Sequence, residues 1–442
     1  MYDTYRRDST ELYNQAIQYI SGFQFHGFRL GLERMEAIAQ ALDNPHKRYP
    51  CIHVAGTNGK GSVCAFLESI FIEAGLKVGL YTSPHLYCLE ERFRMNREKI
   101  SKGELAELIF KIKRLVEQGY ELSYFEYTTI IAMDWFAKKG VDIAIFETGL
   151  GGRLDATNIV YPKISIITNI SLEHQAFLGD DLGQIAWEKA GIIKESRPVV
   201  CGVREKEALA VIRQRAEELG ASLYLLGRDF DYTPLGGEMM DFSWNGREYL
   251  KGLRLGLTGR HQMENASLAI SASLLLKETH LGGLTQEAIS QGLKGVKWPG
   301  RGEIVTTSKG PIILDGAHNR AGILSLRRLL QEDGHFSKAN VRILLWAMSD
   351  EGGDKDFTGL LDLISDDFDR IIITEPPGPR RPVTIDEWRA KLGEENRFKF
   401  EGNWSGALKR ALAYLSHDSV LVVAGSLYLI GAVREVLKGG VS

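Results

Sequence analysis

The sequence contains little of what would mark a secreted, membrane-bound or nucleic-acid-binding protein. Only four of its 442 residues are cysteines and no two form a C-x-x-C pair, which excludes a disulfide scaffold and argues against a structural zinc site. No apolar run approaches the roughly 20 residues of a membrane span, and the N-terminus lacks the apolar core of a signal peptide. The net charge of −3 gives no sign of a nucleic-acid partner. We expect a cytoplasmic globular protein.

What the sequence does contain is an alternation of apolar strands and amphipathic helices. The apolar runs CIHVAG, VDIAIFETG and KISIITNI predict parallel strands that are covered on both faces. Residues 229–256 alternate polar and apolar side chains around Asn245-Gly246, which predicts a small antiparallel patch with a hairpin turn. A second α/β series follows Trp298-Pro299-Gly300, with helices expected from about 320, 356, 384 and 404. The predicted domains are 1–297 and 298–442.

One glycine-rich stretch lies where a phosphate-binding loop belongs. Residues 56–62 read GTNGKGS and stand between a predicted buried strand and an amphipathic helix. Glycines let successive N–H groups converge on phosphate, Lys60 adds a point charge, and Ser62 can contact phosphate or metal. A tight turn without chemistry would explain one or two glycines, but not the lysine and serine as well. The stretch therefore predicts a triphosphate cradle built from Gly56, Thr57, Asn58, Gly59, Lys60, Gly61 and Ser62.

The loop and nine further motifs carry a resemblance to a known family. GTNGKGS resembles the loop of the Mur ligase superfamily, and its G-K-G-S ending is similar to the folylpolyglutamate synthase and dihydrofolate synthase branch. Motifs similar to that branch follow in order along nearly the whole chain: GLERM at 31–35, TSPHL at 82–86, ERFRMN at 91–96, FETGLGGRLDATN at 146–158, ITNISLEH at 167–174, EKAGIIK at 188–194, PGRGE at 299–303, LDGAHN at 314–319 and GSLYLIG at 425–431. The resemblance implies an ATP-binding domain with a mostly parallel sheet and a smaller Rossmann-like C-terminal domain.

Acidic and basic side chains follow the predicted strands of the first domain. Glu147 ends one strand, at the sheet edge where ligands bind in open α/β folds; it can hold magnesium or cap a neighbouring helix, and the loop upstream favours magnesium. The resemblance implies that Ser83 and His174 are further magnesium ligands. It also implies that Lys189 is carbamylated and helps to bind a second magnesium ion. Simple pairing of Lys189 with a phosphate or a carboxylate remains open at this point.

The resemblance also implies a nucleotide site and an acceptor pocket. Asn265 contacts the adenine, Arg301 the phosphates and Asp315 the ribose, with His318 near the reacting groups. Phe125, Asp155 and Ala156 line a pterin pocket, and the glycines of GLGGR suit a mobile loop at its mouth. Two departures from the family pattern stand out: Arg29 replaces an acid, and Asp354-Lys355-Asp356 follows an extra DEGG, which we interpret as a loop away from the chemistry.

The expected activity is ATP-dependent amide ligation. The acceptor, dihydropteroate or a folate or both, forms an acyl phosphate that L-glutamate then attacks, assisted by two magnesium ions and by Lys60, His174, Lys189, Arg301 and His318. We expect a monomer. A Mur-type ligase with another acceptor is the main alternative, and the roughly fifty residues before the loop disfavour it. A nucleotide switch would keep the loop but have no use for His174, Lys189 or the DGAHN site.

Overall fold

The computed structural model describes residues 2–23, 31–277, 283–350, 355–393 and 397–439. The chain divides into two compact units: Met1–Gly256 with Met263–Val296, and Leu257–Gln262 with Lys297–Ser442. Arg29 and Asp354 lie outside the described residues. No described helix is long and apolar enough to cross a membrane.

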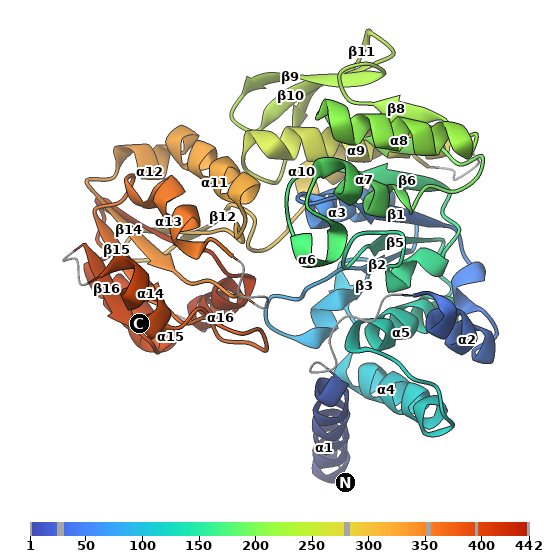
Figure 1. Cartoon of the computed structure of the whole chain (residues 1–442), viewed down its shortest axis with the longest axis horizontal. Helices are drawn as coiled ribbons and strands as arrows, with labels where there is room; N and C mark the ends of the chain where they lie inside the picture. The colour runs from blue at the N-terminus through green and yellow to red at the C-terminus, as the bar shows by residue number, and fades with distance from the viewer. Residues whose placement is uncertain (1, 24–30, 278–282, 351–354, 394–396, 440–442) are drawn as a thin grey trace. The chain divides into compact units, whose positions relative to one another are not determined.

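The first unit is built on an eight-stranded sheet in the order β4-β3-β2-β5-β1-β6-β7-β8. Strands β2, β5, β1, β6, β7 and β8 run parallel, whereas β3 and β4 form an antiparallel edge hairpin. The strand bounds are β1 Cys51–Ala55, β2 Val78–Tyr81, β3 Phe93–Met95, β4 Glu98–Lys99, β5 Ile143–Glu147, β6 Ile164–Ile167, β7 Val199–Cys201 and β8 Leu223–Leu225. The central strands β1, β5 and β6 are fully buried, because helices cover both faces (Figure 1).

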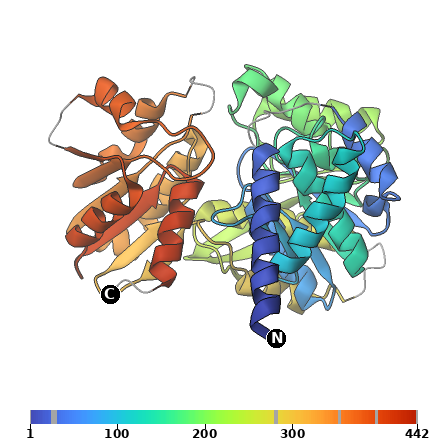
Figure 2. The same ribbon diagram turned by 90° about the horizontal axis from the view of Figure 1, so that it is seen from below.

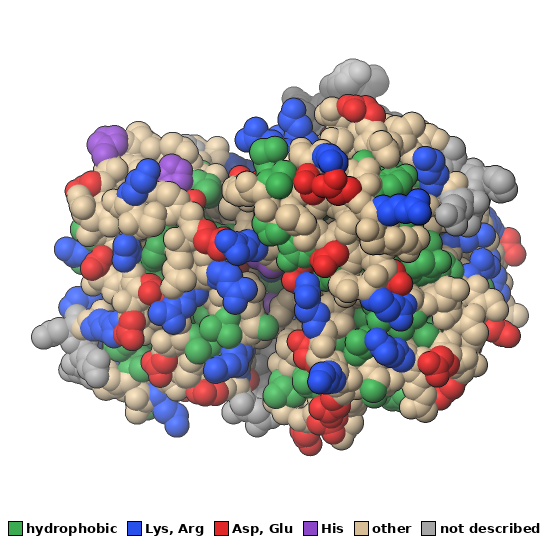
Figure 3. All heavy atoms as spheres, turned by 90° about the horizontal axis from the view of Figure 1, so that it is seen from above, with side chains coloured by type: hydrophobic (Ala, Val, Ile, Leu, Met, Phe, Trp, Pro, Cys, Tyr) green, Lys and Arg blue, Asp and Glu red, His purple; other side chains and the backbone are tan. Residues whose placement is uncertain are grey.

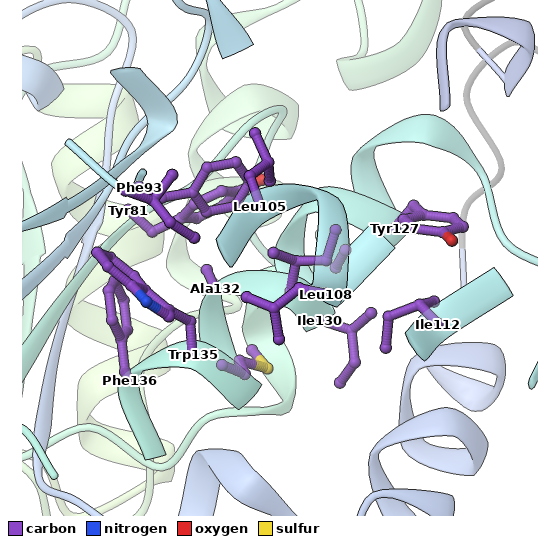
Figure 4. Packing of buried hydrophobic residues seen from close by; sticks show 14 of the residues in the cluster. Tyr81, Phe93, Leu105, Leu108, Ile112, Tyr127, Ile130, Ala132, Trp135 and Phe136 are labelled. Atoms are coloured by element: carbon purple, nitrogen blue, oxygen red, sulfur yellow. The ribbon is translucent and has the colours of Figure 1, made fainter. Parts of the chain in front are cut away.

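Helices from distant parts of the sequence cover this sheet. Helix α3 packs on β1, β2 and β5, and α10 packs on α3. Figure 2 shows α1 beside α4 and α5, whose apolar side chains form one core with α2; Figure 4 shows Trp135, Phe136 and Tyr81 within it. The helices are α1 Tyr2–Ser21, α2 Glu33–Ala41, α3 Lys60–Glu73, α4 Lys102–Glu117, α5 Tyr124–Lys139, α6 Gln175–Leu178, α7 Leu182–Ala190, α8 Lys206–Glu218, α9 Arg260–Lys277 and α10 Gln286–Gly295.

The predicted antiparallel patch is a three-stranded sheet in the order β11-β10-β9. Its strands are β9 Phe230–Gly236, β10 Met239–Trp244 and β11 Arg247–Arg254. Asn245 and Gly246 both have positive φ, 51° and 71°, and join Trp244 to Arg247. A two-residue turn of this kind matches the right-handed twist of the flanking strands, so the expected hairpin is confirmed.

The second unit is a six-stranded sheet in the order β12-β13-β17-β14-β15-β16, in which only β12 is antiparallel. Helices α11–α14 cover one face and α15 and α16 the other. The strands are β12 Glu303–Thr306, β13 Pro311–Leu314, β14 Val341–Trp346, β15 Arg370–Thr374, β16 Phe398–Glu401 and β17 Ser419–Ala424. The helices are α11 Arg320–Glu332, α12 Gly334–Lys338, α13 Phe357–Ser365, α14 Ile385–Leu392, α15 Trp404–Tyr414 and α16 Leu427–Lys438.

Candidate active site

The glycine loop is held in a conformation that side chains would obstruct. Gly56 and Gly59 have φ values of +146° and +84°, a region that L-residues rarely adopt. A Cβ on Gly56 would lie 1.9 Å from the Thr168 hydroxyl, and one on Gly59 would lie 2.3 Å from the Asn265 amide oxygen. Helix α3 begins immediately after Gly59 without a side-chain cap, so its first N–H groups remain available to an anion.

The loop is fastened to the segment that follows the neighbouring strand β6. The Asn58 N–H donates to the Asn169 side chain at 2.9 Å, and the Thr168 hydroxyl donates to the Asn58 carbonyl at 2.6 Å. The Thr57 hydroxyl exchanges hydrogen bonds with the backbone of Ser171 at 3.0 and 3.2 Å. These bonds fix the loop backbone before any ligand binds, which is the arrangement that electrostatic catalysis needs.

Two ammonium groups meet at one atom of the loop. Lys60 Nζ donates to the Gly56 carbonyl at 2.8 Å, and Lys189 Nζ donates to the same oxygen at 2.9 Å. Lys189 comes from the last turn of α7, 133 residues from Gly56 in sequence. Glu173 pairs with Lys189 at 3.0 Å and lies within the field of Lys60 as well. The structure therefore gathers two cations and one carboxylate at the mouth of the loop.

Burial and this pairing change the proton affinities of both partners. Burial disfavours the charged amine of Lys189, and although Glu173 opposes the effect, the pKa of Lys189 falls to about 8. Burial also disfavours the Glu173 carboxylate, but the charges of Lys189 and Lys60 outweigh it and lower the pKa of Glu173 to about 2. Near neutral pH, Glu173 is therefore ionised and Lys189 has an appreciable neutral fraction.

Two of the four predicted magnesium ligands, Ser83 and Glu147, lie at or just after the ends of the adjacent strands β2 and β5. The Ser83 N–H donates to Glu147 Oε2 at 3.0 Å, which joins the ends of β2 and β5. His174 is the residue before α6 and has a positive φ of 47°. In the part of the chain that the structure describes, no three His, Cys, Asp or Glu side chains form a metal cluster. The donors present, a carboxylate and hydroxyls beside a phosphate loop, fit magnesium, which retains water and phosphate oxygens as ligands.

The predicted pterin residues surround a short turn. The Phe125 ring packs on Gly149, where a Cβ would lie 2.5 Å from the ring, and Tyr81 is 6.1 Å from Phe125 between centroids. Asp155 Oδ2 accepts hydrogen bonds from the N–H groups of Gly149 and Leu150, both at 2.9 Å. Asp155 and Ala156 are buried at the start of a short 3-10 turn, Ala156–Ile159.

The GLGGR segment packs closely against α7, and its mobility stays a prediction. A Cβ on Gly152 would lie 2.9 Å from the carbonyls of Glu188 and Lys189 in α7. The Arg153 side chain pairs with Glu188 at 2.7 Å, and the Arg153 N–H donates to the Glu188 carbonyl at 2.7 Å. The glycines allow close approach of two backbones, so this segment is fixed against the helix that carries Lys189.

In the second unit, the predicted residues gather at the carboxyl edge of the sheet. Asp315 follows β13 and accepts from the N–H groups of Gly302 and Ala317 at 2.8 and 2.9 Å, which holds the turn bearing Arg301. The positive charge of Arg301 opposes the rise that burial causes in the pKa of Asp315, and it contributes to the fall in the pKa of His318. His318 Nδ1 donates to the Gly316 carbonyl at 2.8 Å, which leaves Nε2 as an acceptor.

Several basic side chains either act on His318 or make structural contacts with other side chains. Burial first, and then the charges of cations that include Lys355 and Arg380, lower the pKa of His318 to about 3. Residues 351–354 of the extra segment lie outside the described residues, so its interpretation as a loop away from the chemistry stays a prediction. Arg94 pairs with the buried Glu68 at 2.8 Å. Three more arginines make structural contacts: Arg97 pairs with Glu73, Arg381 pairs with Glu387, and Arg92 contacts His85 and the Tyr124 ring.

Comparison with known proteins decides the family. The Mur ligase middle domain matches residues 54–273, and the Mur ligase glutamate ligase domain matches residues 300–427. The chain belongs to the Mur ligase family. It is 35% identical over 436 residues to the dihydrofolate synthase/folylpolyglutamate synthase of Bacillus subtilis, covering 96% of this chain and 99% of that protein. Like its relatives in this branch of the family, it is an ATP-dependent ligase.

Solved Mur ligase structures show the same architecture. The folylpolyglutamate synthase of Thermotoga maritima superposes with a TM-score of 0.82 at 35% identity, covering 97% of both chains. An Escherichia coli enzyme in complex with DHPP and ADP superposes with a TM-score of 0.85 at 32% identity, covering 96% of this chain and 98% of that one. The α/β fold inferred from the sequence is therefore confirmed, as is the family resemblance.

Sequence reasoning missed several residues that the structure places at these sites. Asn169 and Thr168 hold the loop, and the charge of Lys355 helps to lower the pKa of His318. Their signal in the sequence was weak, because each is one polar residue after a strand or in a loop. Only the order of the strands in the sheet showed which of these side chains lie close to one another.

Proposed function

We propose that this enzyme adds L-glutamate to dihydropteroate and to the glutamate tail of folates, through an acyl-phosphate intermediate. The observation that supports this most directly is the meeting of Lys60, Lys189 and Glu173 at Gly56. Similarity to enzymes named for both activities extends over nearly the whole chain.

ATP would bind through backbone N–H groups and two sets of side chains. The loop from Gly56 to Ser62 receives the phosphates, and Asn265, whose amide abuts Gly59, contacts the adenine. In the second unit, Arg301 contributes charge to the phosphates and Asp315 an acceptor for a ribose hydroxyl. Each Asp315 oxygen receives one backbone N–H and keeps a second lone pair for this role.

In the first chemical step, the acceptor carboxylate oxygen attacks the γ-phosphorus and the bond to the β-phosphate oxygen breaks, giving an acyl phosphate and ADP. Lys60 and Arg301 hold the charge of the transferring group. Magnesium bound by Ser83 and Glu147, with a second ion near His174 and Lys189, would supply further positive charge to the phosphate oxygens. Phe125 stacks on the pterin while the Gly149–Leu150 turn orients it.

Lys189 would act as a carbamate rather than as an ammonium group. Its neutral amine takes up carbon dioxide and loses a proton, which gives an anionic oxygen donor on a long stem. The low pKa of about 8 favours this reaction, because burial destabilises the protonated amine. A carbamate on Lys189 would place a second negative charge beside the Glu173 carboxylate. A nearby cation would offset the repulsion, which fits a magnesium ion at the same place.

In the second step, the amino group of L-glutamate attacks the acyl carbon, and phosphate leaves as the amide forms and a proton is released. We place the incoming glutamate at the carboxyl edge of the second unit. His318 is neutral and presents Nε2 to a donor such as the amino group. Arg380 and Lys355 supply positive charge for its carboxylates. The buried Ser426, which precedes α16 and makes no cap hydrogen bond, offers a hydroxyl.

The test is incorporation of radiolabelled glutamate with dihydropteroate, tetrahydrofolate and a folate diglutamate offered separately. We expect incorporation with dihydropteroate and at least one folate, and ADP release only when acceptor and glutamate are both present. Incorporation with neither acceptor class would contradict the proposal and favour a Mur-type ligase with another carboxylate acceptor. ADP release without amino acid would favour a switch. We expect a monomer, and the free thiols of Cys51, Cys64 and Cys201 fit a reducing compartment.

A further inference from the structure

A chain of three polar side chains lies behind the predicted acceptor pocket. His53, in the middle of β1, is completely buried and its Nε2 lies 2.7 Å from the Thr157 hydroxyl. The Thr157 hydroxyl in turn bonds to Asp155 Oδ1, and the Thr157 N–H donates to the same oxygen at 3.0 Å. The neighbours of His53 along the strand, Ile52 and Val54, are apolar and also buried.

The direction of these hydrogen bonds follows from counting protons. Both oxygens of Asp155 accept backbone N–H groups, as those of a carboxylate do, so the single hydroxyl proton of Thr157 also goes to Asp155. His53 must then donate its Nε2–H to the threonine oxygen, which fixes the imidazole in one tautomer. Nδ1 of His53 is left as a buried acceptor with no partner in the described part of the chain. Such an unpaired group is costly, so an apolar residue would serve a purely structural strand better.

Asp155 receives four donors in all, two on each oxygen. Oδ1 accepts the N–H and hydroxyl of Thr157, and Oδ2 accepts the N–H groups of Gly149 and Leu150. A carboxylate has about four lone-pair directions, so the set is complete. Asp155 thereby fixes the turn on which the Phe125 ring rests. The carboxylate acts on the pocket through this turn.

We propose that His53 and Thr157 are positioning residues for the acceptor: through Asp155 they hold the Gly149–Leu150 turn against Phe125 and so set the affinity for the pterin. The inference rests on the proposed function, because it takes the Phe125 pocket as the acceptor site. Neither residue touches the acceptor. Their contribution is the orientation and the full hydrogen bonding of a buried carboxylate beneath the pocket.

The experiment compares Thr157→Val with Thr157→Ser by steady-state kinetics with dihydropteroate, ATP and L-glutamate. Valine has the shape of threonine but deprives Asp155 of one donor and leaves the His53 N–H unpaired, whereas serine keeps the hydroxyl. We expect Thr157→Val to raise the KM for dihydropteroate about tenfold, which corresponds to ~1.4 kcal/mol. The KM for ATP should stay within about twofold of the wild type, and Thr157→Ser should restore most of the affinity.

A matched control is Thr374→Val in the second unit. Thr374 is completely buried and its hydroxyl has no partner among the described residues, so the same substitution there removes no hydrogen bond. A second pair of variants, His53→Gln and His53→Leu, changes the other end of the hydrogen-bonded series His53–Thr157–Asp155. Glutamine can place an N–H donor near the position of Nε2, so His53→Gln should keep the wild-type KM for dihydropteroate. Leucine has no such donor, so His53→Leu should raise that KM.

The proposal is overturned if Thr157→Val folds and leaves the KM for dihydropteroate unchanged, or if it raises the KM values for ATP and dihydropteroate equally. It is also overturned if Thr157→Ser is as impaired as Thr157→Val. Should Thr157→Val not fold, His53→Leu against His53→Gln decides by the same criterion. Wild-type enzyme that ligates no pterin acceptor would instead refute the proposed function, so the two failures are distinguishable.

Discussion

At the scale of single residues, burial and pairing determine what each charged group of the site can do. Lys60 and Lys189 bond to the same carbonyl oxygen, yet only Lys189 is completely enclosed. Enclosure lowers the pKa of its amine to about 8, which makes it the better candidate for covalent modification by carbon dioxide. Lys60, at the start of α3, donates to the carbonyls of Gly56 and Thr57 and keeps the role of a point charge.

This difference gives a prediction for Lys189. If Lys189 carries the proposed carbamate, replacement by alanine should lower kcat at least ~100-fold, since the site would lose an anionic ligand. Short carboxylic acids such as acetate should restore part of the activity by filling the space, whereas Lys60→Ala should not respond to them. The measurement is kcat against acetate concentration in bicarbonate-depleted buffer. Equal response of both variants would argue against a carbamate at Lys189.

Residue assignments from the sequence succeeded to different degrees for physical reasons. The roles of the loop glycines followed from spacing, because positive φ and close backbone approach are local requirements. Local sequence could not show that all four lone pairs of Asp155 are used, or that Lys355 lies beside His318. Those facts depend on which strand ends are neighbours. The assignments of Asn265, Arg301 and Asp315 to the nucleotide stay predictions.

At the scale of elements, glycines decide how closely segments approach. Gly149 lies under Phe125, and Gly152 lies against the last turn of α7. The acceptor turn and the helix of Lys189 are therefore packed together without intervening side chains. A methyl group at either position would separate parts of the site that the proposed reaction needs close together.

Gly149→Ala tests this packing at the acceptor turn. The new Cβ would lie 2.5 Å from the Phe125 ring, so the ring must move. We expect the KM for dihydropteroate to rise about tenfold or more while the KM for ATP changes little. Gly103→Ala is the control, because nothing lies within 4 Å of its Cβ position. An unchanged KM for dihydropteroate in Gly149→Ala would show that the ring position does not matter for binding.

A second prediction concerns the packing of α10 on α3. A Cβ on Gly292 would lie 2.5 Å from the Ile70 Cα, and backbone cannot move aside as a side chain can. Gly292→Ala should lower the free energy of unfolding by about 1–3 kcal/mol. Gly103→Ala, in the exposed first turn of α4, should raise it by up to ~1 kcal/mol. Urea unfolding curves of both variants give the comparison; a stable Gly292→Ala would mean that the helices can separate at little cost.

Element prediction succeeded for strands that carry an apolar run, including the short strands β2, β7 and β8, and failed for strands that lack one. The buried strands β1, β5, β6, β13, β14, β15 and β17 and the start of helices α11, α13, α14 and α15 agree with the sequence pattern. The missed strands are β3, β4, β12 and β16, which lie at or beside sheet edges. Edge strands are partly exposed and carry charged residues, so they lack the continuous apolar signal of central strands.

At the scale of the whole molecule, charge is distributed without a dominant sign. The net charge is −3, and acidic and basic side chains are interspersed on the face in Figure 3. Inside the molecule the balance is different, because several buried or half-buried histidines are neutral. Burial lowers the pKa of His46 to about 4, and of His53, His85 and His318 to about 3, from 6.5.

These histidines predict that acid destabilises the fold. Between the unfolded pKa of 6.5 and the folded values, the unfolded chain binds more protons, so stability is present above pH 6.5 and is lost as the pH falls. A fully buried histidine such as His53 contributes at most about 1.4 kcal/mol per pH unit. Urea midpoints at pH 7.5 and 5.5 measure the effect, and His46→Gln should reduce the difference. Burial raises the pKa of Asp155 and Asp315 and acts in the opposite direction.

The sequence by itself determined the class of fold, the position of the phosphate loop and the family, since apolar periodicity, glycine spacing and the order of motifs are properties of the linear chain. Tertiary structure alone decided that two lysines 129 positions apart share the Gly56 carbonyl, that the GLGGR glycines clamp a turn, and that a buried histidine supports Asp155. The physical reason is that parallel strand order brings together strand ends from distant segments, and burial then sets the charge and hydrogen bonding of the side chains gathered there.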